Sequence, residues 1–122
     1  MTASAQSPTR LYHNSRCSKS RAALELLQAR GVEPDVVYYL ETPPDQAHLH
    51  AILAALRLPA RALLRTTEPE FTDLGLANPA LDDEVLIAAM AAHPNLIERP
   101  VFVHGGRAVI GRPPERVLEL LV

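Results

Sequence analysis

Near the start of the chain, a strand-like segment, a lone cysteine and a helical run follow one another. Leu11–Tyr12 is short and apolar, Cys17 is the only cysteine, and the helical run from Ser20 to Arg30 is closed by Gly31. This order places Cys17 where a strand turns into a helix, beside unpaired backbone N–H groups and the positive end of the helix dipole. Such surroundings favour the thiolate, which is the nucleophilic form of cysteine.

Charged and polar neighbours distinguish Cys17 from a packed core residue. Arg16, Lys19 and Arg21 add positive charge around it. The alternative is a buried structural cysteine, because free cysteine is among the most buried residue types. A structural cysteine usually lies in an apolar run, so the sequence favours a reactive thiol. His13 is near enough to bias the thiol, and a histidine that merely packs at the end of the strand is the equal alternative.

Composition limits the protein's size, compartment and partners. The chain has 122 residues, of which 48% are hydrophobic, so we expect one domain over residues 10–122, after a flexible tail at residues 1–9. A single cysteine excludes an internal disulfide and indicates a reducing compartment, hence a cytoplasmic protein. The net charge of −2 argues against nucleic acid as a partner. The longest apolar run, Val85–Ala92, is too short to span a membrane.

The first half of the chain reads as a βαβ unit followed by helices. Val36–Leu40 is rich in β-branched and aromatic residues, and we expect it to pair in parallel with the strand at Arg10–His13. Asp45–Leu56 shows a helical stripe that Thr42 can cap. Further expectations are a short helical turn at Arg61–Arg65, an irregular segment at Glu68–Pro79, and a helix from Asp82 or Asp83 to Pro94.

The last quarter of the chain predicts a hairpin and a final helix. Val101–Val103 and Ala108–Ile110 flank a Gly-Gly turn, and an amphipathic run follows Pro114. With the βαβ unit, this order predicts an α/β, thioredoxin-like fold. Its mixed four-stranded sheet would carry a helical insertion at about residues 43–96. In that arrangement Pro100 enters the third strand opposite the cysteine, and we expect the Arg99–Pro100 bond to be cis.

Spacing excludes several kinds of chemistry at Cys17. A dithiol redox motif needs a second cysteine where the chain has Ser20, and a phosphatase-type loop needs arginine where it has Ala23. We expect no metal, because there is one cysteine and because His48 and His50 point to different helix faces. Any redox cycle at Cys17 therefore needs a thiol from outside the chain.

Three arginines have unusual neighbours in the sequence. Arg65 ends a helical turn, Arg99 precedes the candidate cis proline, and Arg112 stands between glycine and proline just after a strand. A solvated surface charge is the commoner role of an arginine. Arg99 and Arg112, however, flank the hairpin ends that should face Cys17, and guanidinium groups bind tetrahedral oxyanions through paired hydrogen bonds. A thiolate among arginines suits nucleophilic attack on an oxyanion.

At these positions the chain resembles the arsenate reductases that use glutathione and glutaredoxin, in the branch with Arg-Cys-Ser-Lys-Ser-Arg around the cysteine. The resemblance covers nearly the whole chain after the tail. The matching residues are Tyr12–Asn14, Cys17, Ser20–Arg21, Tyr39–Pro44, Arg61–Arg65, Glu68–Pro69, Leu74–Leu76, His93–Pro94, Arg99–Pro100 and Arg112–Pro113.

The resemblance implies an activity and a role for each site residue. Cys17 would attack arsenate, and His13 would help to keep the thiol ionised. Glutathione would be a co-substrate, glutaredoxin a partner, and no cofactor would be tightly bound. The oxyanion would be bound by Arg65, Arg99, Arg112, Asn14 and Ser20.

Two departures from the best-known reductases and two rival functions accompany the resemblance. Ser15 and Ser18–Lys19 replace a proline and a Gly-Thr pair, which bears on the substrate more than on the chemistry. The first rival is a glutathione-dependent thiol transferase without arsenate activity, in which the arginines bind glutathione carboxylates. The second is a regulator that binds RNA polymerase. Such regulators carry a Cys-x-x-Cys switch, which Ser20 removes here.

Overall fold

The structure, a computed structural model, describes residues 9–121 and divides into two compact units. The sheet unit comprises the chain up to Thr42 and from Arg99 onward, and the helical unit comprises residues 43–98. Residues 1–8 of the expected tail lie outside the described residues. Thr9, which was also expected in the tail, instead begins the first strand.

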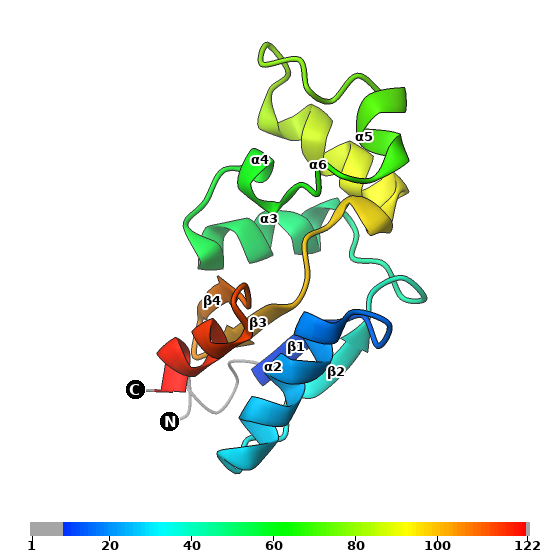
Figure 1. Cartoon of the computed structure of the whole chain (residues 1–122). Coiled ribbons are helices and arrows are strands. Elements are labelled where there is room, and N and C mark those ends of the chain that lie inside the picture. The colour runs from blue at the N-terminus through cyan, green and yellow to red at the C-terminus, as the bar shows by residue number, and fades with distance from the viewer. Residues whose placement is uncertain (1–8, 122) are drawn as a thin grey trace. The chain divides into compact units, whose positions relative to one another are not determined.

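The sheet unit contains the mixed four-stranded sheet that the sequence predicts (Figure 1). The strand order is β2-β1-β3-β4, with β1 parallel to β2 and the β1–β3 and β3–β4 pairs antiparallel. This topology confirms the predicted thioredoxin-like α/β fold. The strands are β1 (Thr9–His13), β2 (Asp35–Tyr38), β3 (Val101–His104) and β4 (Arg107–Ile110).

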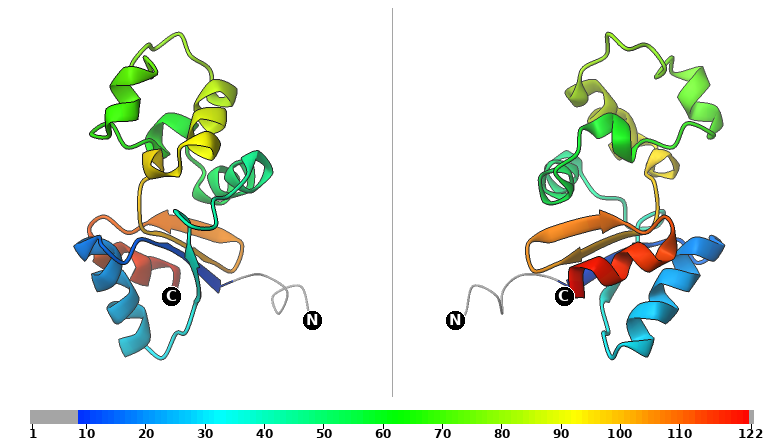
Figure 2. Two further views of the ribbon diagram at one scale, coloured as in Figure 1. Left: turned by 90° about the vertical axis from the view of Figure 1, so that its right-hand side faces the viewer. Right: turned by 60° about the vertical axis from the view of Figure 1, so that its left-hand side comes forward.

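Two helices pack together against one face of this sheet (Figure 2). They are α2 (Ser18–Ala29) and η2 (Pro114–Leu121), and η2 is a 3-10 helix. Helical spacing aligns Ala23 with Leu27 on the buried side of α2. The core that holds the unit together consists of Leu11, Ala23, Leu27, Phe102, Val109, Val117 and Leu120.

Turn residues set the ends of these elements. Gly105 and Gly106 both have positive φ, at 61° and 77°, as a tight hairpin turn between right-twisted strands requires. The second strand is shorter than the predicted Val36–Leu40, because a turn begins at Tyr39. The backbone N–H groups of Glu41 and Thr42 both donate to the Tyr38 carbonyl, which closes that turn.

The helical unit holds the remaining helices. An antiparallel bridge between Leu64 and Ile97 ties its last segment to the region before α5. Among the described residues, no helix is long and apolar enough to cross a membrane. The helices of this unit are α3 (Gln46–Leu56), α4 (Ala60–Leu63), α5 (Pro69–Asp73), α6 (Asp83–Ala92) and the 3-10 helix η1 (Pro94–Leu96).

Three sequence predictions in this unit are wrong. The helical turn expected at Arg61–Arg65 is α4, which spans Ala60–Leu63, so Arg65 lies beyond its end. The N-cap of α3 is Asp45 rather than Thr42, because the Asp45 carboxylate accepts the backbone N–H of His48 at 2.8 Å. The segment expected to be irregular contains α5, whose first residue is Pro69. Proline suits the first helical position, since its missing N–H would have no partner there.

Candidate active site

Cys17 is the N-cap residue of α2. Its backbone is extended, with φ −95° and ψ 121°, and its carbonyl accepts the backbone N–H of Arg21 at 3.0 Å. Its own N–H donates to the Asn14 carbonyl at 3.0 Å, so the preceding loop is closed on itself. The cysteine is neither fully buried nor fully exposed. The sulfur thus sits at the amino end of the helix, where backbone N–H groups are free to meet an anion.

The local groups lower the pKa of the Cys17 thiol below its ordinary value. Burial on its own raises this pKa, but hydrogen bonds from the Ser20 backbone N–H, the Arg99 side chain and the Lys19 backbone N–H outweigh it. The charge of Arg99 acts in the same direction. A larger fraction of the thiol is therefore ionised near neutral pH than in an ordinary cysteine, as the sequence predicts.

Arg99 and Arg112 approach the sulfur from the two ends of the hairpin. Arg112 Nη2 lies 3.7 Å from Cys17 Sγ, and Arg112 Nε donates to the Arg99 carbonyl at 2.9 Å. The Arg99–Pro100 bond is cis, which confirms the prediction, and Arg112–Pro113 is a second cis bond that the sequence did not reveal. The structure thus brings both of these predicted arginines to the cysteine.

Gly111 holds the two arginine-bearing segments together, and sequence reasoning missed it. Its N–H donates to the Pro100 carbonyl at 2.8 Å. A Cβ on Gly111 would meet Pro100 Cγ at 2.8 Å and Val117 Cγ1 at 3.1 Å. The absence of a side chain therefore allows the end of β4 to approach Pro100. A glycine directly before Arg112 was the available signal.

His13, Ser20 and Asn14 form a connected network behind Cys17. His13 is 4% exposed, and its Nδ1 lies 2.7 Å from the hydroxyl of fully buried Ser20. That hydroxyl accepts the Asn14 backbone N–H at 3.1 Å, and Asn14 Oδ1 accepts the Arg16 backbone N–H at 2.9 Å. These contacts fix the conformation of the loop, while oxyanion binding by Asn14 and Ser20 stays a prediction.

The surroundings of His13 favour a neutral imidazole. Burial lowers the pKa of His13 from 6.5, and the charge of Arg21 lowers it further. At neutral pH the ring therefore carries no charge that could attract the thiolate. An effect of His13 on Cys17 would have to pass through Ser20, and its expected catalytic role stays a prediction.

Arg65 belongs to the helical unit, where carboxylates surround it. Its Nη1 lies 2.6 Å from Glu98 Oε1, and its Nε lies 3.5 Å from Glu68 Oε2. Asn95 continues the cluster, since its Nδ2 donates to both Glu68 and Glu70. Arg65 thus has a structural role within its own unit, and its expected role as an oxyanion ligand stays a prediction.

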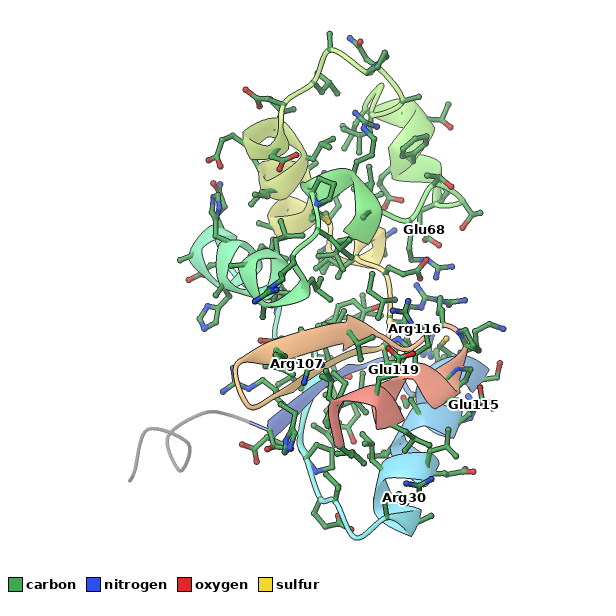
Figure 3. All side chains as sticks on the ribbon, turned by 90° about the vertical axis from the view of Figure 1, so that its left-hand side faces the viewer. Arg30, Glu68, Arg107, Glu115, Arg116 and Glu119 are labelled. Atoms are coloured by element: carbon green, nitrogen blue, oxygen red, sulfur yellow. The ribbon has the colours of Figure 1, made fainter. Side chains whose placement is uncertain are left out.

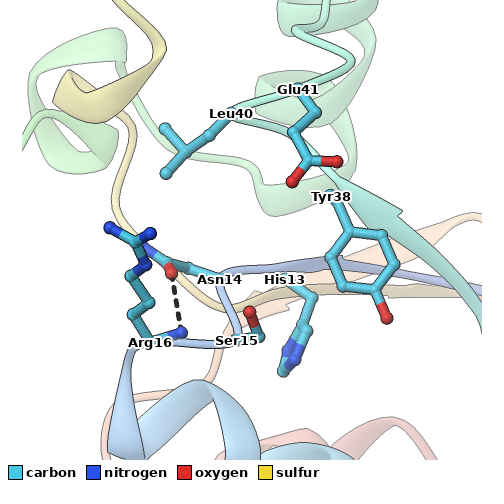
Figure 4. A pocket seen from close by; sticks show the side chains of 7 residues that line it. All are labelled: His13, Asn14, Ser15, Arg16, Tyr38, Leu40 and Glu41. Carbon is cyan, nitrogen blue, oxygen red and sulfur yellow. Dashed lines mark hydrogen bonds between the residues drawn. The ribbon is translucent and has the colours of Figure 1, made fainter.

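A pocket of about 250 Å³ is lined in part by the loop that precedes Cys17 (Figure 4). One wall is the loop from His13 to Arg16, and the other consists of Tyr38, Leu40 and Glu41. Sequence reasoning assigned no ligand to this second wall. Within residues 9–121, no group of three or more histidine, cysteine, aspartate or glutamate residues is arranged to hold a metal ion.

Comparison with known protein families matches residues 12–120 to the ArsC family. The chain belongs to the ArsC family. It is 47% identical over 113 residues to a protein of Neisseria meningitidis serogroup B named arsenate reductase, covering 92% of this chain and 97% of that one. The identity is 52% to the uncharacterised protein YfgD of Escherichia coli K12, over 92% of this chain and 95% of YfgD.

A solved structure supports the same membership in the ArsC family. The structure titled arsenate reductase from Vibrio cholerae superposes with a TM-score of 0.90 at 46% sequence identity. The match covers 93% of this chain and 98% of that one. The comparisons thus confirm membership in the ArsC family over residues 12–120.

Proposed function

We propose that this ArsC-family protein reduces arsenate to arsenite, with the Cys17 thiolate as nucleophile and with glutathione and glutaredoxin as sources of electrons. The observation that carries the proposal is the thiolate site itself, in which Arg112 Nη2 lies 3.7 Å from Sγ and the Arg99 side chain lowers the thiol pKa. Guanidinium groups beside a thiolate attract an oxyanion and stabilise the charge that develops during attack. Relatives named arsenate reductase support arsenate as that oxyanion.

The residues of the sheet unit have different roles in this proposal. Arg99 and Arg112 bind the oxyanion with directed hydrogen bonds and hold it against the sulfur. Neutral His13 acts through Ser20, whose hydroxyl it contacts at 2.7 Å, and keeps the Ser20 backbone N–H directed at the sulfur. Arg65 remains a predicted ligand on the strength of the resemblance alone.

Two thiols, those of Cys17 and glutathione, supply the two electrons that reduce arsenate to arsenite. The Cys17 thiolate forms a sulfur–arsenic bond, and one arsenate oxygen leaves as water after taking up protons. The glutathione thiolate then attacks the Cys17 sulfur. The electron pair of the sulfur–arsenic bond stays on arsenic, which leaves as trivalent arsenite, and the two sulfurs remain joined as a mixed disulfide. A glutaredoxin thiolate takes up the glutathione and frees Cys17.

This cycle sets the requirements for the cell compartment and for cofactors. Both electrons come from thiols, so the reaction needs no tightly bound cofactor beyond glutathione as co-substrate. Glutathione is kept reduced in the cytoplasm, which is where we place the protein. The single cysteine supports the requirement for an outside reductant, because no second thiol in the chain could resolve the adduct.

The proposal is tested by measuring arsenite formation with the purified protein, arsenate, glutathione and glutaredoxin. We expect turnover with the full mixture and loss of turnover when glutathione or arsenate is omitted. Turnover of a glutathione mixed disulfide without any arsenite formation would instead identify a thiol transferase and overturn the proposal.

A further inference from the structure

The pocket beside Cys17 lies at a place where sheets of this kind usually bind ligands. His13 ends β1 and Tyr38 ends β2, and these residues pair in the parallel register. Ligands of open α/β sheets bind outside the carboxyl ends of such parallel strands. The rings of His13 and Tyr38, one from each wall of the pocket, meet edge to face with centroids 5.8 Å apart.

The walls combine apolar surface with two opposite charges. Tyr38 and Leu40 are 47% and 43% exposed, which places them among the exposed large hydrophobic side chains of residues 9–121. Arg16 comes from the loop before Cys17 and Glu41 from the segment after β2, so the charges stand on different walls (Figure 4). Such a pocket complements a small molecule with an apolar stem, a carboxylate and an ammonium group.

We infer that this pocket binds the reducing thiol, a small zwitterionic peptide thiol, with Arg16 on a carboxylate and Glu41 on the ammonium group. The inference rests on the proposed function, in which an outside thiol must reach the Cys17 sulfur. Arg16 is the residue directly before Cys17, and neighbouring Cα atoms are about 3.8 Å apart. A tripeptide spans up to about 10 Å when extended, so its thiol can reach the sulfur while its charged end lies in the pocket.

The alternatives fit the pocket less well. A tetrahedral oxyanion would be repelled by Glu41 and would gain nothing from Tyr38 and Leu40, whereas Arg99 and Arg112 suit it. The volume of about 250 Å³ is close to the lower end of small-ligand pockets, about 300 Å³, and suits part of a tripeptide. The pocket is lined by none of Cys17, Arg99 and Arg112, so the thiol and the oxyanion would contact different side chains.

Binding is tested without chemistry in the full-length Cys17→Ser protein. Glutathione is titrated into the isotope-labelled variant, and backbone amide shifts are followed by NMR. We expect the largest shifts at residues 13–16 and 38–41. Arg16→Ala and Glu41→Gln should each weaken binding by about fivefold or more. N-acetylated glutathione, which lacks the ammonium group, should bind more weakly than glutathione and should be insensitive to Glu41→Gln.

Matched controls use exposed charges elsewhere in the sheet unit. Arg30→Ala and Glu33→Gln remove the same kinds of charge, and Arg30 lies at the end of α2 remote from Cys17 (Figure 3). Both should bind glutathione like the parent variant. Equal binding by Glu41→Gln and the parent, or shifts centred on Arg99 and Arg112 alone, would overturn the inference. Failure of arsenite formation would not produce either result, since this readout is binding and not turnover.

Discussion

The arginines of the two units have different partners. In the sheet unit, Arg112 donates to a neutral carbonyl and faces the Cys17 sulfur at 3.7 Å. In the helical unit, Arg65 lies 2.6 Å from one carboxylate and 3.5 Å from another. The first guanidinium is directed at a nucleophile, whereas the second joins segments of its own unit. These contacts motivate different tests, namely oxyanion binding for Arg112 and stability for Arg65.

Loss of the nucleophile gives the largest expected effect. Cys17→Ser should reduce arsenite formation to the background rate, because a hydroxyl is not ionised at neutral pH and cannot form the sulfur–arsenic bond. The free energy of unfolding should change by less than about 0.5 kcal/mol, since the exchange alters little volume. Turnover and urea unfolding of the purified variant check both statements. Retained turnover would end the proposed mechanism.

Arg112→Ala should weaken oxyanion binding while leaving the fold in place. Losing a hydrogen-bond partner of a charged group costs about 2 kcal/mol, which corresponds to roughly 30-fold in affinity. Sulfate or arsenate affinity, measured by calorimetry, checks this. Arg30→Ala is the control, because Arg30 is exposed at the far end of α2. If the control weakens binding as much as Arg112→Ala, the oxyanion site is misplaced.

Gly111→Ala should destabilise the sheet unit and disturb both arginines near Cys17. The new methyl group would lie 2.8 Å from Pro100 Cγ, and such overpacking costs about 1–3 kcal/mol. Denaturant unfolding and the pH dependence of Cys17 alkylation measure the two effects. Gly31→Ala is the matched control. A Cβ there meets nothing within 4 Å, although φ is +76° and carries its own strain, so the thiol pKa should not move.

Arg65→Ala tests whether Arg65 stabilises the helical unit. The side chains of Arg65, Glu98 and Glu68 are 15%, 23% and 24% exposed, so removing the guanidinium leaves two partly buried carboxylates without it. We expect a loss of about 1–3 kcal/mol in stability, with faster amide exchange in residues 60–98. In a double-mutant cycle, Glu98→Gln should be less costly when Arg65 is already absent. Unchanged stability would remove the contrast with Arg112.

Local patterns predicted the sheet unit well. The β-branched run around Val36 and the Gly-Gly turn determine neighbouring strands, because strand propensity and turn geometry are properties of short segments. The position of Cys17 followed from a strand, a loop and a helix in succession. The helical unit was predicted less well. Both Thr42 and Asp45 can cap a helix, and the choice between them depends on the path of the chain.

Arg99 and Arg112 were predicted to face Cys17, but other site features that depend on distant segments were not predictable from the sequence. Gly111 matters because its backbone meets Pro100, and a glycine before Arg112 does not by itself reveal that contact. The pocket wall at Tyr38 and Leu40 arises because β2 ends where β1 ends, through the His13–Tyr38 register. Arg65 shows the converse case, since its place just after a short helix does not reveal its carboxylate partners.

Replacing His13 gives the smallest and most specific expected effect, which is a change in the pH dependence of stability. His13 also differs in its surroundings from the histidines of the helical unit. His48 and His50 are surface residues that lie 2.8 Å and 2.9 Å from the carboxylates of Asp45 and Glu84. His13 is buried, and burial lowers its pKa from 6.5. When the pH falls below about 6.5, the unfolded chain takes up a proton at this position before the folded chain does. Protonation therefore favours unfolding, and stability falls from about pH 6.5 down to the lowered pKa.

His13→Gln should remove this part of the pH dependence. The free energy of unfolding is compared between wild type and variant from pH 7 to pH 5, and the His13 ring protons are titrated by NMR. The lowered pKa values of Asp45 and Glu70 act in a separate window, because those carboxylates lose their stabilising contribution only as the pH falls through values below their ordinary 3.8 and 4.5. Equal pH slopes in the two proteins would mean that His13 is not held neutral by the fold. In that case His13 would act on the thiol through Ser20 as a charged imidazole and not as a neutral one.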